Sequence, residues 1–232
     1  MSGAFQLHLI TEPKGNPTEL AAALQRAAGA GIDWLQLRDK QASGLAIYRQ
    51  AEELRRITAR AGVALSINDR LDVALAVGVD GVHLAGQSLP LAAARQVAAG
   101  RLLLGRSVHS LDEAVAEAKA GADYLTFGHV FPTSSKPGLP PQGVAQLAAI
   151  VSAVDVPVLA IGGINVANLE QVLATGCAGI ALISAILSAS DPGQAARQLR
   201  QALDASPHRP RCPFPITSAE VSHAPNRQPT AV

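Results

Sequence analysis

The sequence has little charge, few aromatic side chains and almost no cysteine. Charged residues make up 16% of the 232 positions and the formal net charge is +1, so no strongly basic surface is available for nucleic acid or an anionic membrane. The two cysteines, Cys177 and Cys212, are too few for a disulfide framework and form no CxxC motif. The first nine residues lack the pattern of a signal peptide, and no apolar stretch reaches transmembrane length. We therefore expect a cytoplasmic protein with no nucleic-acid and no membrane partner.

Hydrophobic residues, by contrast, make up 48% of the chain, which is enough to fill a large core. Short apolar runs alternate with alanine-rich segments of helical period, a pattern typical of βαβ units and a parallel sheet. The expected strands are Phe5–Thr11, Trp34–Lys40, Ala64–Asp69, Gly81–Ala85, Leu102–Val108, Tyr124–Val130, Val156–Gly162 and Gly179–Ser184. About eight strands in a chain of this length predict an α/β fold, a single TIM (β/α)₈ barrel over residues 1–205.

Local signals mark where helices begin and where the barrel ends. Ser110-Leu111-Asp112-Glu113 has the form of a capping box, and Asp191-Pro192 predicts a helix that starts with proline in its first turn. After the last helix, six prolines occur between residues 206 and 232 and little apolar periodicity remains. We expect this segment to be a disordered or loosely attached tail, and no second domain.

Polar residues gather where the expected strands end, and in a (β/α)₈ barrel those ends form the active site. Glycines and small residues follow strands seven and eight, where barrels bind phosphate through backbone N–H groups and a helix N-terminus; the alternative is that they form only tight turns. The candidate binding residues at the strand ends and in the loops beyond them are Arg38, Lys40, Asn68, Ser107, His109, Lys136, Gly143, Gly162, Gly163, Ser184 and Ala185.

The basic candidates have two alternative interpretations. Arg38 and Lys40 alternate along one strand and share a face, so they either hold an anion at the mouth of the barrel or form a solvated strand end. Lys136 lies in a long polar loop, Pro132–Gly138, which is either a lid over the mouth or an ordinary surface loop.

One histidine has the position of a general acid/base. His129 ends the sixth expected strand between apolar neighbours, and a neutral imidazole can accept and return a proton near pH 7. His8 and His83 lie inside expected strands, where satisfied core histidines are the simpler interpretation. His109 also ends a strand, but it directly precedes the capping box, so loop structure can explain it.

Several motifs, taken together, resemble the thiamine-phosphate synthase superfamily. The segments that carry the resemblance are Gln36–Lys40, Ile67–Arg70, Gly81–Leu84, Gly105–His109, Phe131–Gly138, Ala160–Ile164 and Ser184–Ile186. They occur in order and at family spacing between about Phe5 and Asp204. The resemblance implies a TIM barrel that binds a small phosphorylated thiazole, and it leaves a homodimer open because barrels of this family often dimerise.

Two positions bear on the choice between the branches of this superfamily. Gly128–Phe131 resembles the thiazole tautomerase (TenI type), in which the histidine isomerises an alkylidene carboxythiazole phosphate to its aromatic form. The synthase branch instead holds magnesium with two aspartates; Asp69 matches the first, but Ser88 stands at the second, where it can cap the next helix. Magnesium needs hard, charged oxygen ligands. The resemblance therefore favours a tautomerase with catalytic His129 and no cofactor or metal.

Two alternatives remain open. The first is thiamine-phosphate synthase, which joins an aminopyrimidine diphosphate to thiazole phosphate, with Asp69 as a magnesium ligand. The residues that match the diphosphate-binding set of a synthase are Gln36, Arg38, Lys40, Asn68, Asp69 and Lys136. The second is a non-catalytic regulatory protein that binds a partner protein; binding of thiazole phosphate without turnover would favour it.

Overall fold

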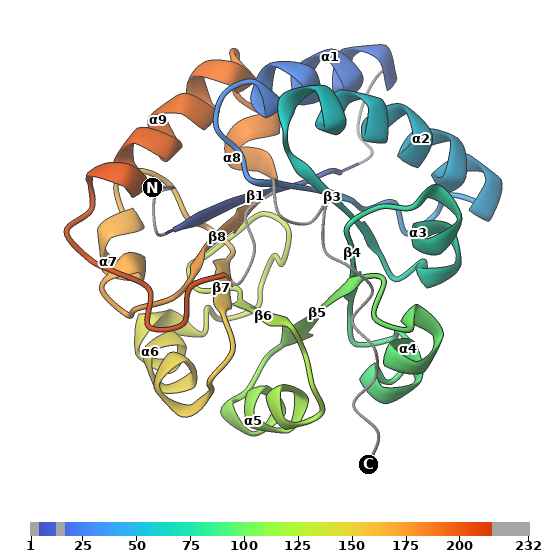
Figure 1. Ribbon diagram of the computed structural model, residues 1–232. Coiled ribbons are helices and arrows are strands. Elements are labelled where there is room, and N and C mark those ends of the chain that lie inside the picture. Colours follow the sequence, from blue (N-terminus) through green and yellow to red (C-terminus); the bar gives the residue numbers. More distant parts are fainter. Residues whose placement is uncertain (1–4, 13–16, 215–232) are drawn as a thin grey trace.

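Eight parallel strands close into a barrel in chain order in the computed structural model, which describes residues 5–12 and 17–214 (Figure 1). The strands are β1 (Gln6–Ile10), β2 (Trp34–Leu37), β3 (Ala64–Asn68), β4 (Gly81–Leu84), β5 (Leu103–Val108), β6 (Tyr124–Gly128), β7 (Val158–Ile161) and β8 (Gly179–Leu182). The ring closes where β8 pairs with β1, Gly179 beside Gln6. This confirms the predicted α/β fold and the TIM barrel.

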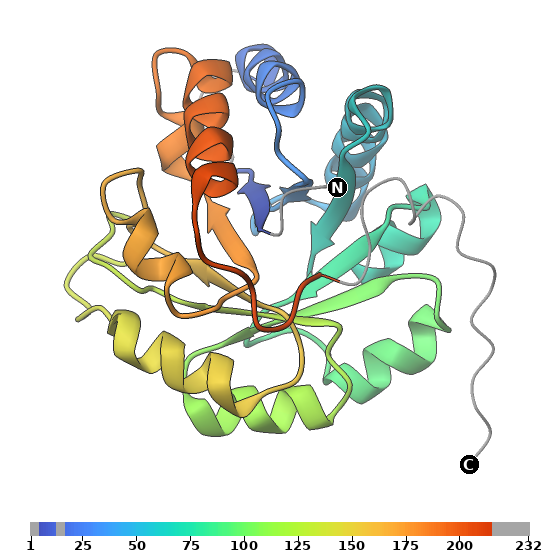
Figure 2. The same cartoon turned by 60° about the vertical axis from the view of Figure 1, so that its left-hand side comes forward.

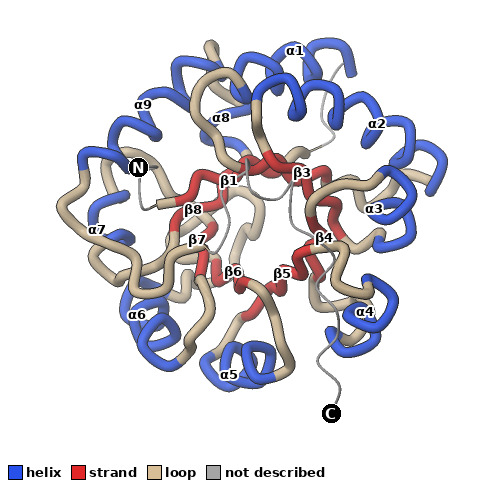
Figure 3. The backbone as a smooth tube through the Cα atoms, viewed as in Figure 1, coloured by secondary structure: helices blue, strands red, loops and turns tan. Residues whose placement is uncertain are grey.

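Helices form a continuous outer layer around the strands (Figure 3). They are α1 (Pro17–Ala28), α2 (Gly44–Ala61), α3 (Leu71–Val77), α4 (Leu91–Ala98), α5 (Leu111–Lys119), α6 (Gly143–Ala153), α7 (Leu169–Leu173), α8 (Ser184–Leu187) and α9 (Pro192–Ala205). The hydroxyl of Ser110 accepts the backbone N–H of Glu113 at 3.1 Å, as the capping box predicts. In the described part of the chain, the helices are too short or too polar to cross a lipid bilayer.

The core fills both the barrel and the layer between strands and helices. Every residue of β1, β2, β3, β4, β6 and β8 is buried, as expected for parallel strands covered on both faces. The strands end earlier than the apolar runs suggest: β2 stops at Leu37, so Arg38 and Lys40 leave the ladder and enter the following loop. Those loops form the mouth at the carboxyl end of the barrel.

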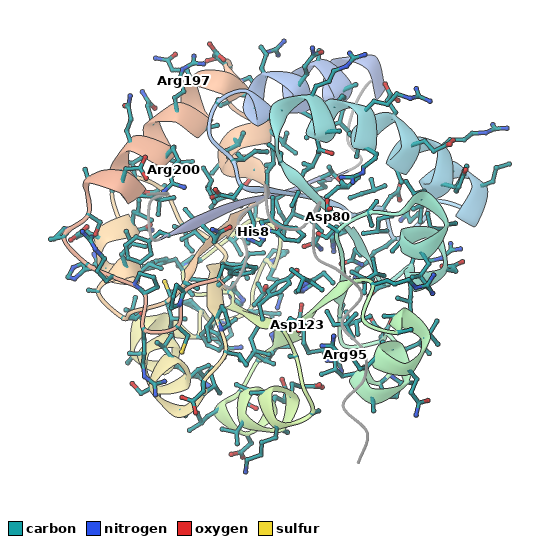
Figure 4. The ribbon with its side chains drawn as sticks, viewed as in Figure 1. His8, Asp80, Arg95, Asp123, Arg197 and Arg200 are labelled. Atoms are coloured by element: carbon teal, nitrogen blue, oxygen red, sulfur yellow. The ribbon has the colours of Figure 1, made fainter. Side chains whose placement is uncertain are left out.

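Three aspartates link neighbouring strands at the amino end of the barrel, and we call them the strand staples. Each directly precedes an even-numbered strand and accepts a backbone N–H from the strand before it. The bonds are Asp33 with Leu7 (2.7 Å), Asp80 with Leu65 (2.8 Å) and Asp123 with Leu104 (2.7 Å). Each carboxylate also pairs with an arginine of an outer helix. The ion pairs are Asp33 with Arg200 (3.1 Å), Asp80 with Arg55 (3.0 Å) and Asp123 with Arg95 (2.8 Å). Figure 4 labels both residues of the last pair.

Residues 206–214 run from the end of α9 across the amino end of the barrel (Figure 2). The guanidinium of Arg211 donates to the carbonyls of Val151 and Val154 at 2.6 and 2.7 Å. The ring of Phe214 lies 5.1 Å from that of Tyr124 and 5.3 Å from that of His8. The prediction of a loosely attached tail therefore does not hold for these nine residues, because several of their side chains, Arg211 and Phe214 among them, find specific partners. Residues 215–232 lie outside the described residues.

Candidate active site

A cavity of about 320 Å³ lies at the carboxyl ends of the strands. Eleven of the twelve predicted site residues line it: Arg38, Lys40, Asn68, Ser107, His109, His129, Lys136, Gly162, Gly163, Ser184 and Ala185. Gly143 is the exception among the described residues; its N–H donates to the carbonyl of Val130 at 3.1 Å where α6 begins, so its place is structural. The barrel thus brings together residues that are up to 147 positions apart in the sequence, from Arg38 to Ala185.

Three basic side chains, Arg38, Lys40 and Lys136, line the cavity. Within residues 5–12 and 17–214 no carboxylate forms an ion pair with any of them. The backbone N–H of Arg38 donates to the hydroxyl of Thr11 at 2.8 Å, which fixes the start of the loop. Beside them, the buried Gln36 amide donates to the side-chain oxygen of Asn68 at 3.1 Å. Unpaired cations that converge on a cavity favour an anionic ligand.

A glycine turn at the end of β7 forms another part of the cavity wall. Gly162 and Gly163 have left-handed φ values of 97° and 66°. A Cβ on Gly162 would collide with the side chain of His129, and one on Gly163 would collide with the carbonyl of Pro132. Only glycine lets the backbone of this turn lie so close to the end of β6. Ser184 and Ala185, at the end of β8, line the cavity next to this turn.

His129 is 5% exposed and forms part of the cavity wall. Its Nε2 lies 3.2 Å from the carbonyl oxygen of Leu139, which can only accept, so Nε2 is the donor. Its Nδ1 is buried and has no hydrogen-bond partner in the described part of the chain. The backbone carbonyl of His129 also accepts the N–H of Gln142 at 2.9 Å. Through both bonds, His129 ties the loop that carries Lys136 to the end of β6.

A buried polar row that the sequence did not predict reaches the cavity from below. His83 Nε2 lies 2.8 Å from the Ser107 hydroxyl, and His83 Nδ1 lies 3.2 Å from the Tyr124 hydroxyl. Burial lowers the pKa of His83 to about 4; Asp69 opposes this and Arg106 adds to it. The interpretation of His83 as a satisfied core residue was correct about its burial but missed that it lines the cavity. A histidine in an otherwise apolar strand was the only available signal.

Asp69 lies just behind the cavity wall, with a left-handed φ of 63°. Its Oδ1 accepts the N–H of Ala85 at 3.1 Å and contacts the hydroxyl of Ser88, while its Oδ2 accepts the Asn68 amide at 2.5 Å. Ser88 therefore does not cap α4, whose cap position is Pro90 and has no side-chain bond. No cluster of three histidine, cysteine or acidic residues suited to a metal occurs in the described part of the chain. The site offers one carboxylate and one hydroxyl.

Comparisons with known proteins agree with one another. The sequence pattern of the family described as thiamine monophosphate synthase matches residues 7–186. A thiamine-phosphate synthase of Chloroflexus aurantiacus is 47% identical over 180 residues, covering 77% of this chain and 83% of that protein. One of Pyrococcus abyssi is 42% identical over 200 residues, covering 86% and 95%. The solved thiamine phosphate pyrophosphorylase of Pyrococcus furiosus has a TM-score of 0.80 and 38% identity, over 87% of this chain and 96% of that one.

These findings correct the prediction of a thiazole tautomerase, and with it the isomerase class. The relatives at 42–47% identity are named synthases, and so is the family. The prediction placed most weight on one imidazole, His129, whose Nε2 is engaged by the carbonyl of Leu139. It gave too little weight to the residues that match the diphosphate-binding set of a synthase, of which Arg38, Lys40 and Lys136 line the cavity.

Proposed function

Because the chain belongs to the thiamine monophosphate synthase family, we propose that it is a thiamine-phosphate synthase, a transferase of thiamine biosynthesis. It would join an aminopyrimidine diphosphate to a thiazole phosphate: the bond between the pyrimidine methylene carbon and diphosphate breaks, and a bond to the thiazole nitrogen forms. One observation carries this proposal. The cavity is lined both by three basic side chains and by a glycine turn, each of which suits an anion, and this reaction brings two phosphorylated substrates together.

The three basic side chains of the cavity suit the diphosphate. Arg38, Lys40 and Lys136 are free of carboxylate partners within the described residues, so their charge is available to a ligand. Negative charge grows on the diphosphate as its bond to carbon breaks, and fixed cations stabilise that charge more in the transition state than in the ground state. Asn68, held by Gln36, adds a polar group to the lining of the same cavity.

The glycine turn suits the phosphate of the thiazole substrate. Gly162 and Gly163 present backbone to the cavity with no side chain in the way, and Ser184 and Ala185 lie beside them. The loops after the seventh and eighth strands are the usual phosphate site of this fold. The thiazole ring would then extend toward the centre of the cavity, where the pyrimidine carbon must approach its nitrogen.

Magnesium fits the donor set at Asp69. The carboxylate accepts the Asn68 amide and the N–H of Ala85 and contacts the Ser88 hydroxyl, so one carboxylate and one hydroxyl would supply the oxygen ligands just behind the cavity wall. Magnesium in phosphoryl sites is commonly held by one or two carboxylates, with substrate oxygens and waters completing the shell. When bound, the ion would neutralise charge on the diphosphate. Ser88 in place of a second carboxylate predicts weaker metal binding than two aspartates would give.

The test is release of diphosphate by the full-length protein with both substrates and magnesium. Diphosphate is measured by a coupled assay, and thiamine phosphate by mass spectrometry. We expect product only when both substrates are present, and a loss in kcat/KM on the order of 10² for Lys136→Met, since one positioned cation is removed from the leaving group. Lys119→Met, at the last turn of α5, is the matched control and should leave the rate unchanged. No diphosphate release by the wild-type protein would overturn the proposal.

A further inference from the structure

Three side chains form a hydrogen-bonded row through the interior of the barrel, from the cavity to its amino end. Ser107 and His83 line the cavity, 2.8 Å apart, and Tyr124 lies beneath His83 at 3.2 Å. His83 is 4% exposed and Tyr124 is 1% exposed. Tyr124 does not line the cavity, so it touches no substrate. Any effect it has on the reaction must pass through His83.

The register of the strands creates this contact. His83 of β4 is paired with Gly105 of β5, and Gly105 is paired with Tyr124 of β6. The imidazole and the phenol meet over the glycine between them. A Cβ at Gly105 would collide with the Tyr124 hydroxyl and lie 2.6 Å from Nδ1 of His83. The absence of a side chain at Gly105 is therefore what allows the bond to form.

Counting donors and acceptors fixes the direction of each bond. In the described part of the chain, the buried Tyr124 hydroxyl has one partner, Nδ1 of His83. A buried hydroxyl donates its hydrogen where it can, so Nδ1 accepts. A neutral imidazole carries one N–H, which then resides on Nε2 and donates to the Ser107 oxygen.

The geometry points to Tyr124 as a positioning residue for the active site: by holding His83 in its Nε2–H tautomer, it makes the Ser107 hydroxyl donate its own hydrogen into the cavity. Ser107 has no other hydrogen-bond partner within the described residues, so that hydrogen is available to a ligand. The row therefore selects a hydrogen-bond acceptor, such as an unprotonated ring nitrogen or a phosphate oxygen, at the point of the substrate that lies over Ser107.

Phe214 closes the lower end of the row. Its ring lies 5.1 Å from that of Tyr124, and it packs on the small cluster of Tyr124, Leu159 and Ala178. An apolar ring at this place keeps the amino end of the barrel from offering water as a second partner to the phenol. Phe214, in the segment after α9, thus helps to leave Nδ1 of His83 as the acceptor for the Tyr124 hydroxyl.

The first experiment reads the tautomer without any substrate. In protein labelled with ¹⁵N-histidine, two-bond nitrogen–proton correlations at pH 7 distinguish a protonated Nε2 from a protonated Nδ1. We expect His83 as the Nε2–H form in the wild type, and a mixture of both forms in Tyr124→Phe. Tyr48→Phe removes the only other tyrosine hydroxyl, which contacts Glu52 on α2, and should leave the wild-type spectrum. A wild-type His83 protonated on Nδ1 would overturn the inference, even if Tyr124→Phe did not fold.

The second experiment uses the reaction and so depends on the proposed function. Tyr124→Phe should lower kcat/KM about fivefold, the net worth of one misdirected hydrogen bond. Ser107→Ala should lower it further, and adding Tyr124→Phe to Ser107→Ala should have little additional effect, because both act through one hydroxyl. Fully additive losses would contradict the row. A wild-type protein that releases no diphosphate contradicts the proposed function alone, since the tautomer measurement still decides the inference.

Discussion

Gly163 and Gly62 have nearly the same left-handed conformation, with φ of 66° and 67°, but different surroundings. A Cβ on Gly163 would strike the carbonyl of Pro132, whereas one on Gly62 would meet no atom within 4 Å. Both alanine variants take on the left-handed strain, roughly 1 kcal/mol, but only Gly163→Ala must also displace the loop after β6. We expect it to raise KM for thiazole phosphate at least tenfold, measured by steady-state kinetics. Equal KM values for Gly163→Ala and Gly62→Ala would argue against a phosphate site at this turn.

His8 predicts an effect of pH on stability. Burial, with a smaller effect of His83, lowers its pKa to about 3 from the ordinary 6.5. Below pH 6.5 His8 is protonated in the unfolded chain but stays neutral in the folded chain. The free energy of unfolding therefore decreases as the pH falls, by up to about 1.4 kcal/mol per pH unit. His8→Phe, which keeps a ring between Trp34 and Phe214, removes this dependence. Urea unfolding at pH 7 and pH 5 should show roughly 2 kcal/mol less loss in the variant; equal losses would refute this.

Single residues show which part of the site the sequence could predict. Arg38, Lys136 and the Gly162–Gly163 turn were predictable because the barrel fixes where strand ends lie. The contact between His83 and Tyr124 was not, because it depends on the register of three strands and on a glycine between the two residues. Gly143 was misplaced since a glycine that starts a helix resembles one that faces a ligand.

At the scale of elements, the strand staples predict large costs from single substitutions. The side chain of Asp80 is 8% exposed, and Asp80→Ala would leave the buried N–H of Leu65 without an acceptor and Arg55 without its partner. We expect a loss of about 2–4 kcal/mol in the free energy of unfolding, measured in urea. Asp72→Ala is the matched control, because its ion pair with Arg70 involves a carboxylate that is 65% exposed; it should cost below about 1 kcal/mol. Similar costs for both would contradict the staple.

The elements themselves were largely predictable. Eight apolar runs gave eight strands, because strands buried on both faces must be continuously apolar. Residues 206–214 were missed, since proline-rich composition signals no periodic element even where Arg211 and Phe214 are anchored. Composition describes the average character of a segment and does not reveal one or two specific contacts.

At the scale of the whole molecule, the two ends of the barrel have separate tasks. Arg211 anchors the last described segment at the amino end, and Lys136 lines the cavity at the carboxyl end. Arg211→Ala should lower Tm by roughly 3–6 °C, as expected for about 1–2 kcal/mol in a chain of this size, with KM unchanged. Lys136→Met should raise KM for the diphosphate substrate with Tm unchanged. Calorimetry and kinetics on both variants check this, and a shift of both quantities in either one would contradict the division.

The function was the least predictable property at this scale. The barrel and its phosphate side follow from the positions of apolar runs and glycines, but the choice between two reactions depended on one histidine and one serine. Such residues can serve structure in one relative and chemistry in another. His129, bonded to Leu139, and Ser88, in contact with Asp69, both have structural partners that the sequence does not show.

The strand staples have a consequence for how the chain can be re-cut. They join β1 to β2, β3 to β4 and β5 to β6, and none of them spans the connection between β4 and β5. Both ends of the described chain meet at the amino end of the barrel: Phe5 accepts a bond from Arg200 there, and Phe214 packs on His8. In a circular permutant with its original ends joined and new termini placed after α4, the two strands of every stapled pair would remain consecutive in the sequence. New termini between β3 and β4 would instead place the two strands of one stapled pair at opposite ends of the chain.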